Sequence, residues 1–151
     1  MHLYPADILM PDFTATSGKL WSVVACDQYT AEPEYWRRVE DEVGSLPSTL
    51  RLMLPEVYLG EADARVPAIH AAMRDYIDRG ILKIHRRRAV WLERTQSDGR
   101  VRRGLVAAVD LEEYDFSADS TSLIRPTERT VAERIPPRIG VRRGAALEMP
   151  H

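Results

Sequence analysis

Two amphipathic helical stripes constrain the fold most, because each must bury its apolar face against another layer. The first begins at Pro33, a residue that suits a first helical turn, and ends before Gly44. The second runs from near Asp63 to Arg79. Pro67 must lie in its first turn, because deeper in a helix it would cost about 3 kcal/mol. The apolar faces are Trp36, Val39 and Val43 in the first helix, and Val66, Ile69, Met73, Tyr76 and Ile77 in the second.

Four apolar or β-branched runs are typical of strands. They cover residues 20–25, 49–54, 89–95 and 101–110. Asp98-Gly99 predicts a hairpin turn between the last two, and the unbroken apolar run at 105–109 predicts a central strand. The order strand, helix, strand, helix, hairpin predicts an α/β (α+β mixed) fold: a mixed β-sheet with a C-terminal hairpin and helices packed on it.

The length of 151 residues is typical of one domain. Residues 1–18 hold Pro5, Pro11 and Gly18 and are expected to form an extended N-terminal arm. Residues 19–151 are expected to form a single mixed α/β domain that is incomplete at its C-terminus, because no closing element follows Pro136-Pro137. Apolar and charged shares of 44% and 29% are typical of a globular protein and exclude general disorder.

Composition also indicates the cell compartment of the protein and the classes of partner that it is expected to bind. Cys26 has no second cysteine to pair with, and residues 1–12 lack a cationic, apolar leader, which indicates the cytoplasm. No apolar run approaches the ~20 residues that span a bilayer, so no membrane partner is expected. A net charge of −2 argues neither for a nucleic-acid binder nor for an acid-tailed partner, and a nucleic-acid partner is not expected. An unclosed C-terminus favours a homo-oligomer or a missing C-terminal region.

The first candidate site follows the predicted strand at 20–25. Ligands of α/β sheets gather outside the strand ends, where Asp27 and Gln28 stand. Asp27 is a candidate acid or base, and Gln28 a candidate hydrogen-bonding ligand group. In the alternative interpretation, Asp27 or Thr30 caps the following helix.

The second candidate site is the segment 125–134. A helix is predicted to begin near Thr127 and to be kinked or broken at Pro136-Pro137. Free backbone N–H groups at a helix start, hydroxyls and guanidiniums together hold phosphate. The phosphate-binding candidates are Arg125, Thr127, Thr130 and Arg134, and Glu128 is a candidate base or water-mediated metal ligand. A capped amphipathic helix with a solvated, ion-paired face is the equal alternative.

The predicted hairpin is basic, with seven cationic or imidazole side chains, His85, Arg86, Arg87, Arg88, Arg100, Arg102 and Arg103. A solvated face explains it better than a phosphate-backbone site, which would need interleaved aromatics. No metal site is predicted, because His70 has no second histidine or cysteine at metal spacing.

Several co-linear blocks resemble the bacterial and archaeal family called domain of unknown function 1015. The blocks are residues 26–36, 48–59, 80–82, 103–106, 111–115 and 124–138, so the resemblance covers the chain from about Lys19 onward. Glu128 and Thr130 match the family's Glu-x-Thr step. The resemblance implies a ParB-like protein, distantly similar to free serine kinases.

Longer members also carry an Asp-Gly-Asn/His-His-type motif, and no Asp-Gly-x-His segment occurs here. The resemblance therefore implies the N-terminal portion of such a protein. It would contribute part of a phosphate or nucleotide site, with ADP or ATP and Mg²⁺ as the implied cofactors. In full-length relatives the reaction would be phosphotransfer to a small hydroxy amino acid such as serine, and a complete kinase is not expected here. The alternative is a non-catalytic module that binds protein or nucleic acid through the Arg-rich hairpin.

Overall fold

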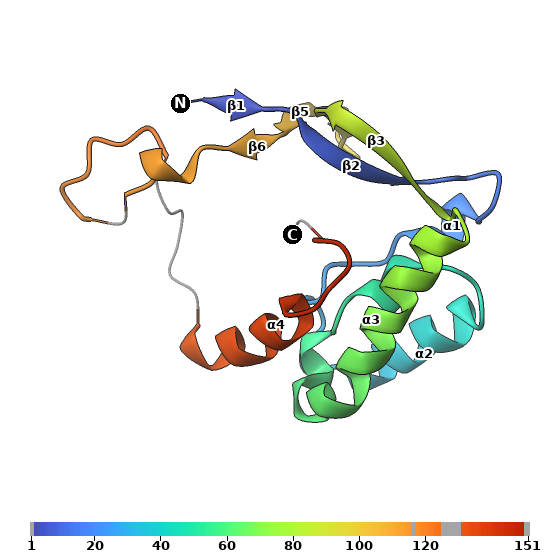
Figure 1. Cartoon of the computed structure of the whole chain (residues 1–151). Helices are drawn as coiled ribbons and strands as arrows, with labels where there is room; N and C mark the ends of the chain where they lie inside the picture. Colours follow the sequence, from blue (N-terminus) through green and yellow to red (C-terminus); the bar gives the residue numbers. More distant parts are fainter. Residues whose placement is uncertain (1, 116, 125–130, 150–151) are drawn as a thin grey trace. The chain divides into compact units, whose positions relative to one another are not determined.

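A computed structural model describes residues 2–115, 117–124 and 131–149 (Figure 1). The α-helices are α1 (Gly18–Trp21), α2 (Pro33–Val43), α3 (Ala62–Asp78) and α4 (Ile135–Arg142). The strands are β1 (Leu3–Tyr4), β2 (Ala6–Pro11), β3 (Leu82–Arg88), β4 (Val90–Thr95), β5 (Val101–Val106) and β6 (Ala108–Val109). Short 3₁₀ turns cover Thr49–Leu52, Glu56–Glu61, Leu111–Glu113 and Ala132–Arg134. The predicted mixed α/β class is confirmed.

The strands of the described residues pair two by two, as β1 with β6, β2 with β3, and β4 with β5. The predicted single mixed sheet is therefore replaced by three two-stranded ladders. The prediction of a central strand at 105–109 is wrong, because β5 pairs with β4 and β6 with β1, and Leu105 is 53% exposed.

The chain forms two compact units. One holds residues 1–10 and 84–129, and the other residues 11–83 and 130–151. Every buried apolar side chain found among the described residues belongs to the second unit, which we call the helical unit. Its core centres on Trp36, Leu52 and Met73. No helix of the described ranges is long and apolar enough to cross a membrane.

Both predicted long helices are present with the predicted faces. Trp36 and Val43 of α2 are buried, as are Ile69, Met73 and Tyr76 of α3. Gly44 ends α2 with φ 54°, and its N–H donates to the carbonyl of Glu40. Pro67 lies deeper than predicted, as the sixth residue of α3. α3 begins at Ala62, close to the predicted start near Asp63 and directly after a 3₁₀ turn, so Pro67 falls in its second turn.

The prediction of a strand at 20–25 is wrong. α1 ends at Trp21, and residues 22–25 make no ladder. Side-chain hydroxyls replace the missing strand partner: Ser48 Oγ and Thr49 Oγ1 donate to the Trp21 carbonyl (3.1 and 2.9 Å), and the Val23 N–H donates to Thr49 Oγ1 (3.3 Å). These hydroxyls lie more than 25 residues away in the chain, and they bond backbone groups that a sheet ladder would otherwise use.

The prediction of a strand at 49–54 is also wrong. Thr49–Leu52 form a 3₁₀ turn whose N-cap is Ser48, and Ser48 Oγ accepts from the Leu50 N–H. Leu52, Met53 and Leu54 are nevertheless all buried. The apolar run therefore predicts the burial of this segment correctly. Its backbone conformation depends on the side-chain cap, which the run does not indicate.

The hairpin is confirmed. β4 and β5 are antiparallel, with Glu93 opposite Arg103, and Gly99 adopts φ 82° in the turn between them. Asp98 Oδ1 accepts from the Arg100 N–H at 3.0 Å, which fixes the turn. A left-handed conformation at this position favours glycine, as the Asp-Gly pair predicted.

The prediction that Pro136-Pro137 kinks or breaks a helix is wrong. α4 begins at Ile135, so both prolines stand in its first turn, where no backbone N–H is needed. α4 packs against α3 within the helical unit (Figure 1). The predicted helix start near Thr127 lies outside the described residues.

Candidate functional site

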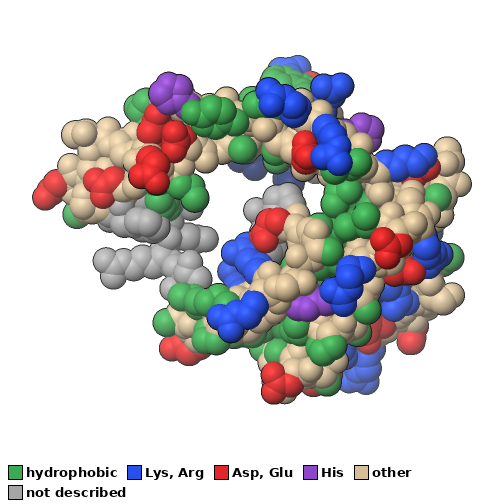
Figure 2. Space-filling model, viewed as in Figure 1, with side chains coloured by type: hydrophobic (Ala, Val, Ile, Leu, Met, Phe, Trp, Pro, Cys, Tyr) green, Lys and Arg blue, Asp and Glu red, His purple; other side chains and the backbone are tan. Residues whose placement is uncertain are grey.

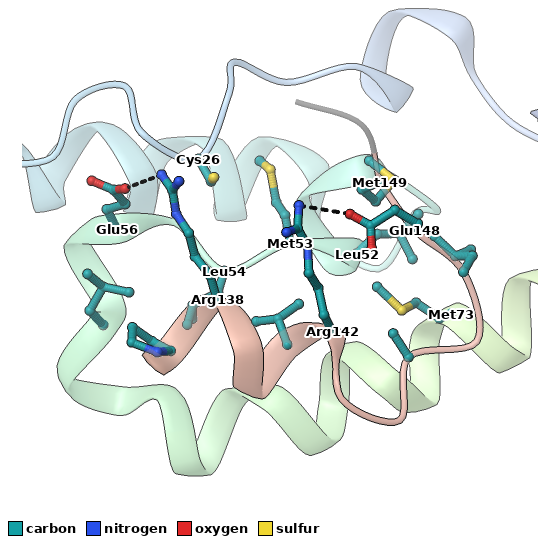
Figure 3. Close-up of a pocket in the computed structure, with 15 residues that line it drawn as sticks. Cys26, Leu52, Met53, Leu54, Glu56, Met73, Arg138, Arg142, Glu148 and Met149 are labelled. Carbon is teal, nitrogen blue, oxygen red and sulfur yellow. Dashed lines mark hydrogen bonds and ion pairs between the residues drawn. The ribbon is translucent and has the colours of Figure 1, made fainter. Parts of the chain in front are cut away.

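Three arginines stand one helical turn apart along α4. Arg134 is its N-cap residue, and Arg138 and Arg142 follow at i+4 and i+8. Side chains at this spacing lie on one helix face. We call these three residues the arginine row. Figure 3 shows Arg138 and Arg142 extending side by side from the helix.

Glu56 forms ion pairs with two residues of the arginine row, Arg134 and Arg138. Its Oε1 accepts from Arg138 Nη2 at 2.8 Å, and its Oε2 lies 3.1 Å from Arg134 Nη1. The Glu56 side chain is only 4% exposed, whereas each guanidinium-bearing side chain is 39% exposed. The backbone also holds this residue, because the Glu56 N–H donates to the Cys26 carbonyl at 2.8 Å. The carboxylate is thus fixed, and the arginines keep access to solvent.

Arg142 has a different partner. Its Nη2 lies 2.9 Å from Oε1 of Glu148, and both side chains are 58% exposed. The five side chains carry three positive and two negative charges, so the cluster has a surplus of one positive charge. An exposed ion pair of this kind contributes little to stability and exchanges readily with solutes.

An apolar pocket of about 50 Å³ lies beside the arginine row (Figure 3). Glu56, Arg138, Arg142 and Glu148 provide its charged lining. The rest of its lining is apolar or sulfur-bearing, and comprises Cys26, Leu52, Met53, Leu54, Leu59, Met73, Pro137, Val141, Ala145, Leu147 and Met149. All of these residues belong to the helical unit.

Burial raises the pKa of the Cys26 thiol, and the carboxylates of Asp27 and Glu56 add to this, whereas Arg138 opposes it. A buried thiol of raised pKa is protonated at neutral pH and is a poor nucleophile. Cys26 therefore contributes pocket surface and a backbone acceptor, in agreement with its sequence interpretation as a small buried hydrophobe.

Asp27 and Gln28, the first predicted site, are not among the residues that line this pocket. Asp27 and Gln28 directly follow Cys26, and both are exposed. Gln28 Nε2 donates to Asp27 Oδ1 at 3.3 Å, and the Gln28 N–H donates to the Ala25 carbonyl at 3.0 Å. The two side chains stand on a turn rather than at the end of a strand, because the strand at 20–25 does not form.

Most of the second predicted site lies outside the described residues, namely Arg125, Thr127, Glu128 and Thr130. Arg134 is described, and it is engaged with Glu56 as given above.

One other group could hold a cation. In the unit formed by residues 1–10 and 84–129, pairing of β1 with β6 brings His2, Asp110 and Glu113 together, with donor atoms within 4.8 Å of one another. Glu113 Oε1 already lies 2.5 Å from His2 Nδ1. The sequence did not indicate this group, because His2 is more than a hundred residues from Asp110 and Glu113.

Sequence reasoning missed Glu56 and Arg142. The repeat Arg134, Arg138, Arg142 was a readable signal for one basic helix face. Nothing in the sequence pointed to Glu56, because it lies 82 residues from Arg138 and its role depends on tertiary contact.

The model of a family described as protein of unknown function (DUF1015) matches residues 11–151. Searches of the curated proteins and of the solved structures returned no match. The family match includes the whole of α4 and all of the pocket lining. The chain belongs to this family.

Proposed function

We propose that the helical unit binds a small anionic metabolite through the arginine row and contributes part of a phosphate or nucleotide site. The supporting observation is that Arg134 and Arg138 share one buried carboxylate while their side chains stay 39% exposed. Each guanidinium has five N–H donors arranged as a fork that matches phosphate and carboxylate oxygens. Glu56 occupies only part of that capacity, and the cluster keeps a surplus positive charge.

The proposal extends to the residues named from the sequence. Arg125, Thr127 and Thr130 would add ligands next to Arg134 in the chain, Glu128 would serve as a base or water-mediated metal ligand, and Asp27 and Gln28 would orient a small substrate. ADP or ATP with Mg²⁺ would be the nucleotide. In longer, ParB-like relatives the reaction would be phosphotransfer to a small hydroxy amino acid such as serine, since phosphoryl transfer needs mainly positioning and charge neutralisation.

The wider expectations belong to the same proposal: a cytoplasmic protein with a small-molecule or nucleotide ligand, as a homo-oligomer or with a further C-terminal region. A nucleic-acid ligand is disfavoured. In Figure 2 acidic side chains lie among the basic ones on the visible face of the helical unit. Within the hairpin, Arg103 pairs with Glu93 and Arg100 with Asp98.

Isothermal titration with ADP, ATP and inorganic phosphate, each with and without Mg²⁺, tests the proposal. We expect wild type to bind phosphate-bearing ligands and the double variant Arg134→Gln, Arg138→Gln to bind them at least tenfold more weakly. Arg79→Gln, which removes an exposed Arg79–Asp75 pair on α3, is the matched control and should bind as wild type does. Circular dichroism establishes that each variant is folded.

Absence of any phosphate-dependent heat in wild type would refute the proposal. So would unchanged affinity in the folded double variant. Arg138→Lys separates charge from geometry: it keeps the positive charge and removes the fork, so it should weaken binding less than Arg138→Gln.

A further inference from the structure

We infer that the pocket beside the arginine row selects the ligand's apolar part, and that the ligand is a small carboxylic acid with a compact, branched aliphatic chain. This inference rests on the proposed anion site and adds the substrate class to it. Three observations support it: the size of the pocket, the residues that line it, and the position of the guanidiniums at its edge.

The lining excludes a polar substituent. Apart from the four charged residues, the pocket presents aliphatic carbon and sulfur, with Met53, Leu54 and Met73 among its walls. A hydroxyl or amide buried there without a partner would lose its hydrogen bonds with water. Aliphatic carbon loses none, and three methionine side chains can adapt to a branched shape.

The volume sets the size of the group. A water molecule occupies roughly 10–15 Å³ on the same scale, so about 50 Å³ holds a group of about three or four non-hydrogen atoms. A nucleobase, with roughly ten such atoms, exceeds this space. The nucleotide of the proposed function would therefore lie outside the pocket, and the pocket would receive a second, smaller ligand or substrate.

The positive charge of the arginines at the edge of the pocket indicates a ligand with a carboxylate headgroup. Arg138 and Arg142 both line the pocket and stand one helical turn apart. Their acidic partners differ: Glu56 is fixed by burial and a backbone bond, while the exposed Glu148 can be displaced. A carboxylate that replaced Glu148 on Arg142 would place its aliphatic chain over the pocket and would match the surplus positive charge.

The test uses the full chain with methyl-¹³C-labelled methionine, observed by NMR. Met53, Met73 and Met149 line the pocket, whereas Met10 lies in β2 and serves as an internal control. The probes are 3-methylbutanoate, acetate and the neutral amide of 3-methylbutanoate. We expect 3-methylbutanoate to shift the pocket methyl signals and leave Met10 unchanged, with a Kd on the order of 1 mM for a ligand of this size.

Acetate and the neutral amide should bind more weakly than 3-methylbutanoate. Each buried methylene strengthens binding by about fourfold, so acetate, with three fewer carbons, should bind about sixtyfold more weakly. The amide keeps the chain and removes the charge, so it should bind at least tenfold more weakly. Equal affinity for acetate and 3-methylbutanoate would overturn the inference, as would shifts confined to Met10.

A pair of neighbouring substitutions locates the site. Ala145 lines the pocket and Ala146 is exposed, so Ala145→Leu fills the pocket while Ala146→Leu adds the same atoms to the surface. We expect Ala145→Leu to abolish the response to 3-methylbutanoate and Ala146→Leu to preserve it. An undiminished response in Ala145→Leu would overturn the inference. The probe series on wild type decides the matter even when Ala145→Leu fails to fold.

Inorganic phosphate, which has no apolar part, separates the two proposals. Phosphate binding without 3-methylbutanoate binding would refute the aliphatic ligand and leave the anion site standing. Failure of both would refute the proposed function together with this inference.

Discussion

Arg138 donates a 2.8 Å hydrogen bond to Glu56, a carboxylate 82 residues earlier in the chain and almost wholly buried. Arg134 approaches the other oxygen of the same carboxylate. One acidic group thus ties the start of α4 to the turn that leads into α3. It also competes with any anion for the same two guanidiniums, so stability and ligand binding should respond oppositely to its removal.

Glu56→Gln should lower the free energy of unfolding by about 2 kcal/mol, because it removes the buried charge that both arginines contact. It should also tighten phosphate binding, since two guanidiniums lose their competitor. Urea denaturation and phosphate titration measure the two effects. Glu148→Gln is the control: its ion pair with Arg142 is exposed, so the stability change should stay below about 0.5 kcal/mol. A Glu56→Gln protein as stable as wild type would contradict the account of this contact.

Tyr76→Phe should destabilise the helical unit by about 1–3 kcal/mol. The Tyr76 hydroxyl accepts from the Ser48 N–H at 3.0 Å, and Ser48 is completely buried, so its N–H would be left without a partner. Tyr58→Phe provides the comparison, because the Tyr58 hydroxyl makes only a 3.4 Å contact with Glu40. Thermal unfolding of both variants should show the larger loss for Tyr76→Phe, and equal losses would contradict this assignment.

Two glycines near the end of α4 should respond to alanine in opposite directions. Gly140 lies within the helix, and a Cβ there would have no atom within 4 Å, so Gly140→Ala should stabilise by about 0.5–1 kcal/mol. Gly144 has φ 83°, so Gly144→Ala should destabilise by about 1 kcal/mol. Denaturant midpoints measured on the two variants check the opposite signs. Stabilisation by Gly144→Ala would show that the backbone there is not left-handed.

Asp12 should make part of the stability of the helical unit dependent on acid pH. The Lys83 ammonium, 2.5 Å away, and hydrogen bonds from Thr14 lower the pKa of Asp12 from 3.8 to about 2. A carboxyl whose folded pKa is depressed stabilises above its unfolded pKa, and this contribution disappears as pH falls from about 3.8 to about 2.

Asp12→Asn should therefore be less stable than wild type at neutral pH, and the difference should vanish by about pH 2. Unfolding curves at several pH values measure it. Asp78→Asn, at the C-terminal end of α3, serves as the control for a general effect of removing one negative charge. A difference that persists unchanged at the lowest pH would exclude titration of Asp12 as its cause.

The sequence by itself determined the elements whose causes are local. Pro33 and Gly44 bound α2, the 3.6-residue stripe of Ile69 and Met73 marks α3, and Asp98-Gly99 specifies the hairpin turn. In each case the deciding interactions connect residues only a few positions apart. The second predicted site was likewise taken from a local segment, and most of it lies outside the described residues.

Only the tertiary structure decided the backbone at 20–25 and 49–54 and the composition of the pocket. An apolar run states that a segment is buried, but its hydrogen-bond partners come from elsewhere in the chain. Here the hydroxyls of Ser48 and Thr49 donate hydrogen bonds to the Trp21 carbonyl, and no strand forms. Glu56 shows the same limit at the candidate site. Its carboxylate pairs with Arg134 and Arg138 only after folding has brought α4 next to it. The strength of an ion pair depends on the distance in space and not on the separation along the chain.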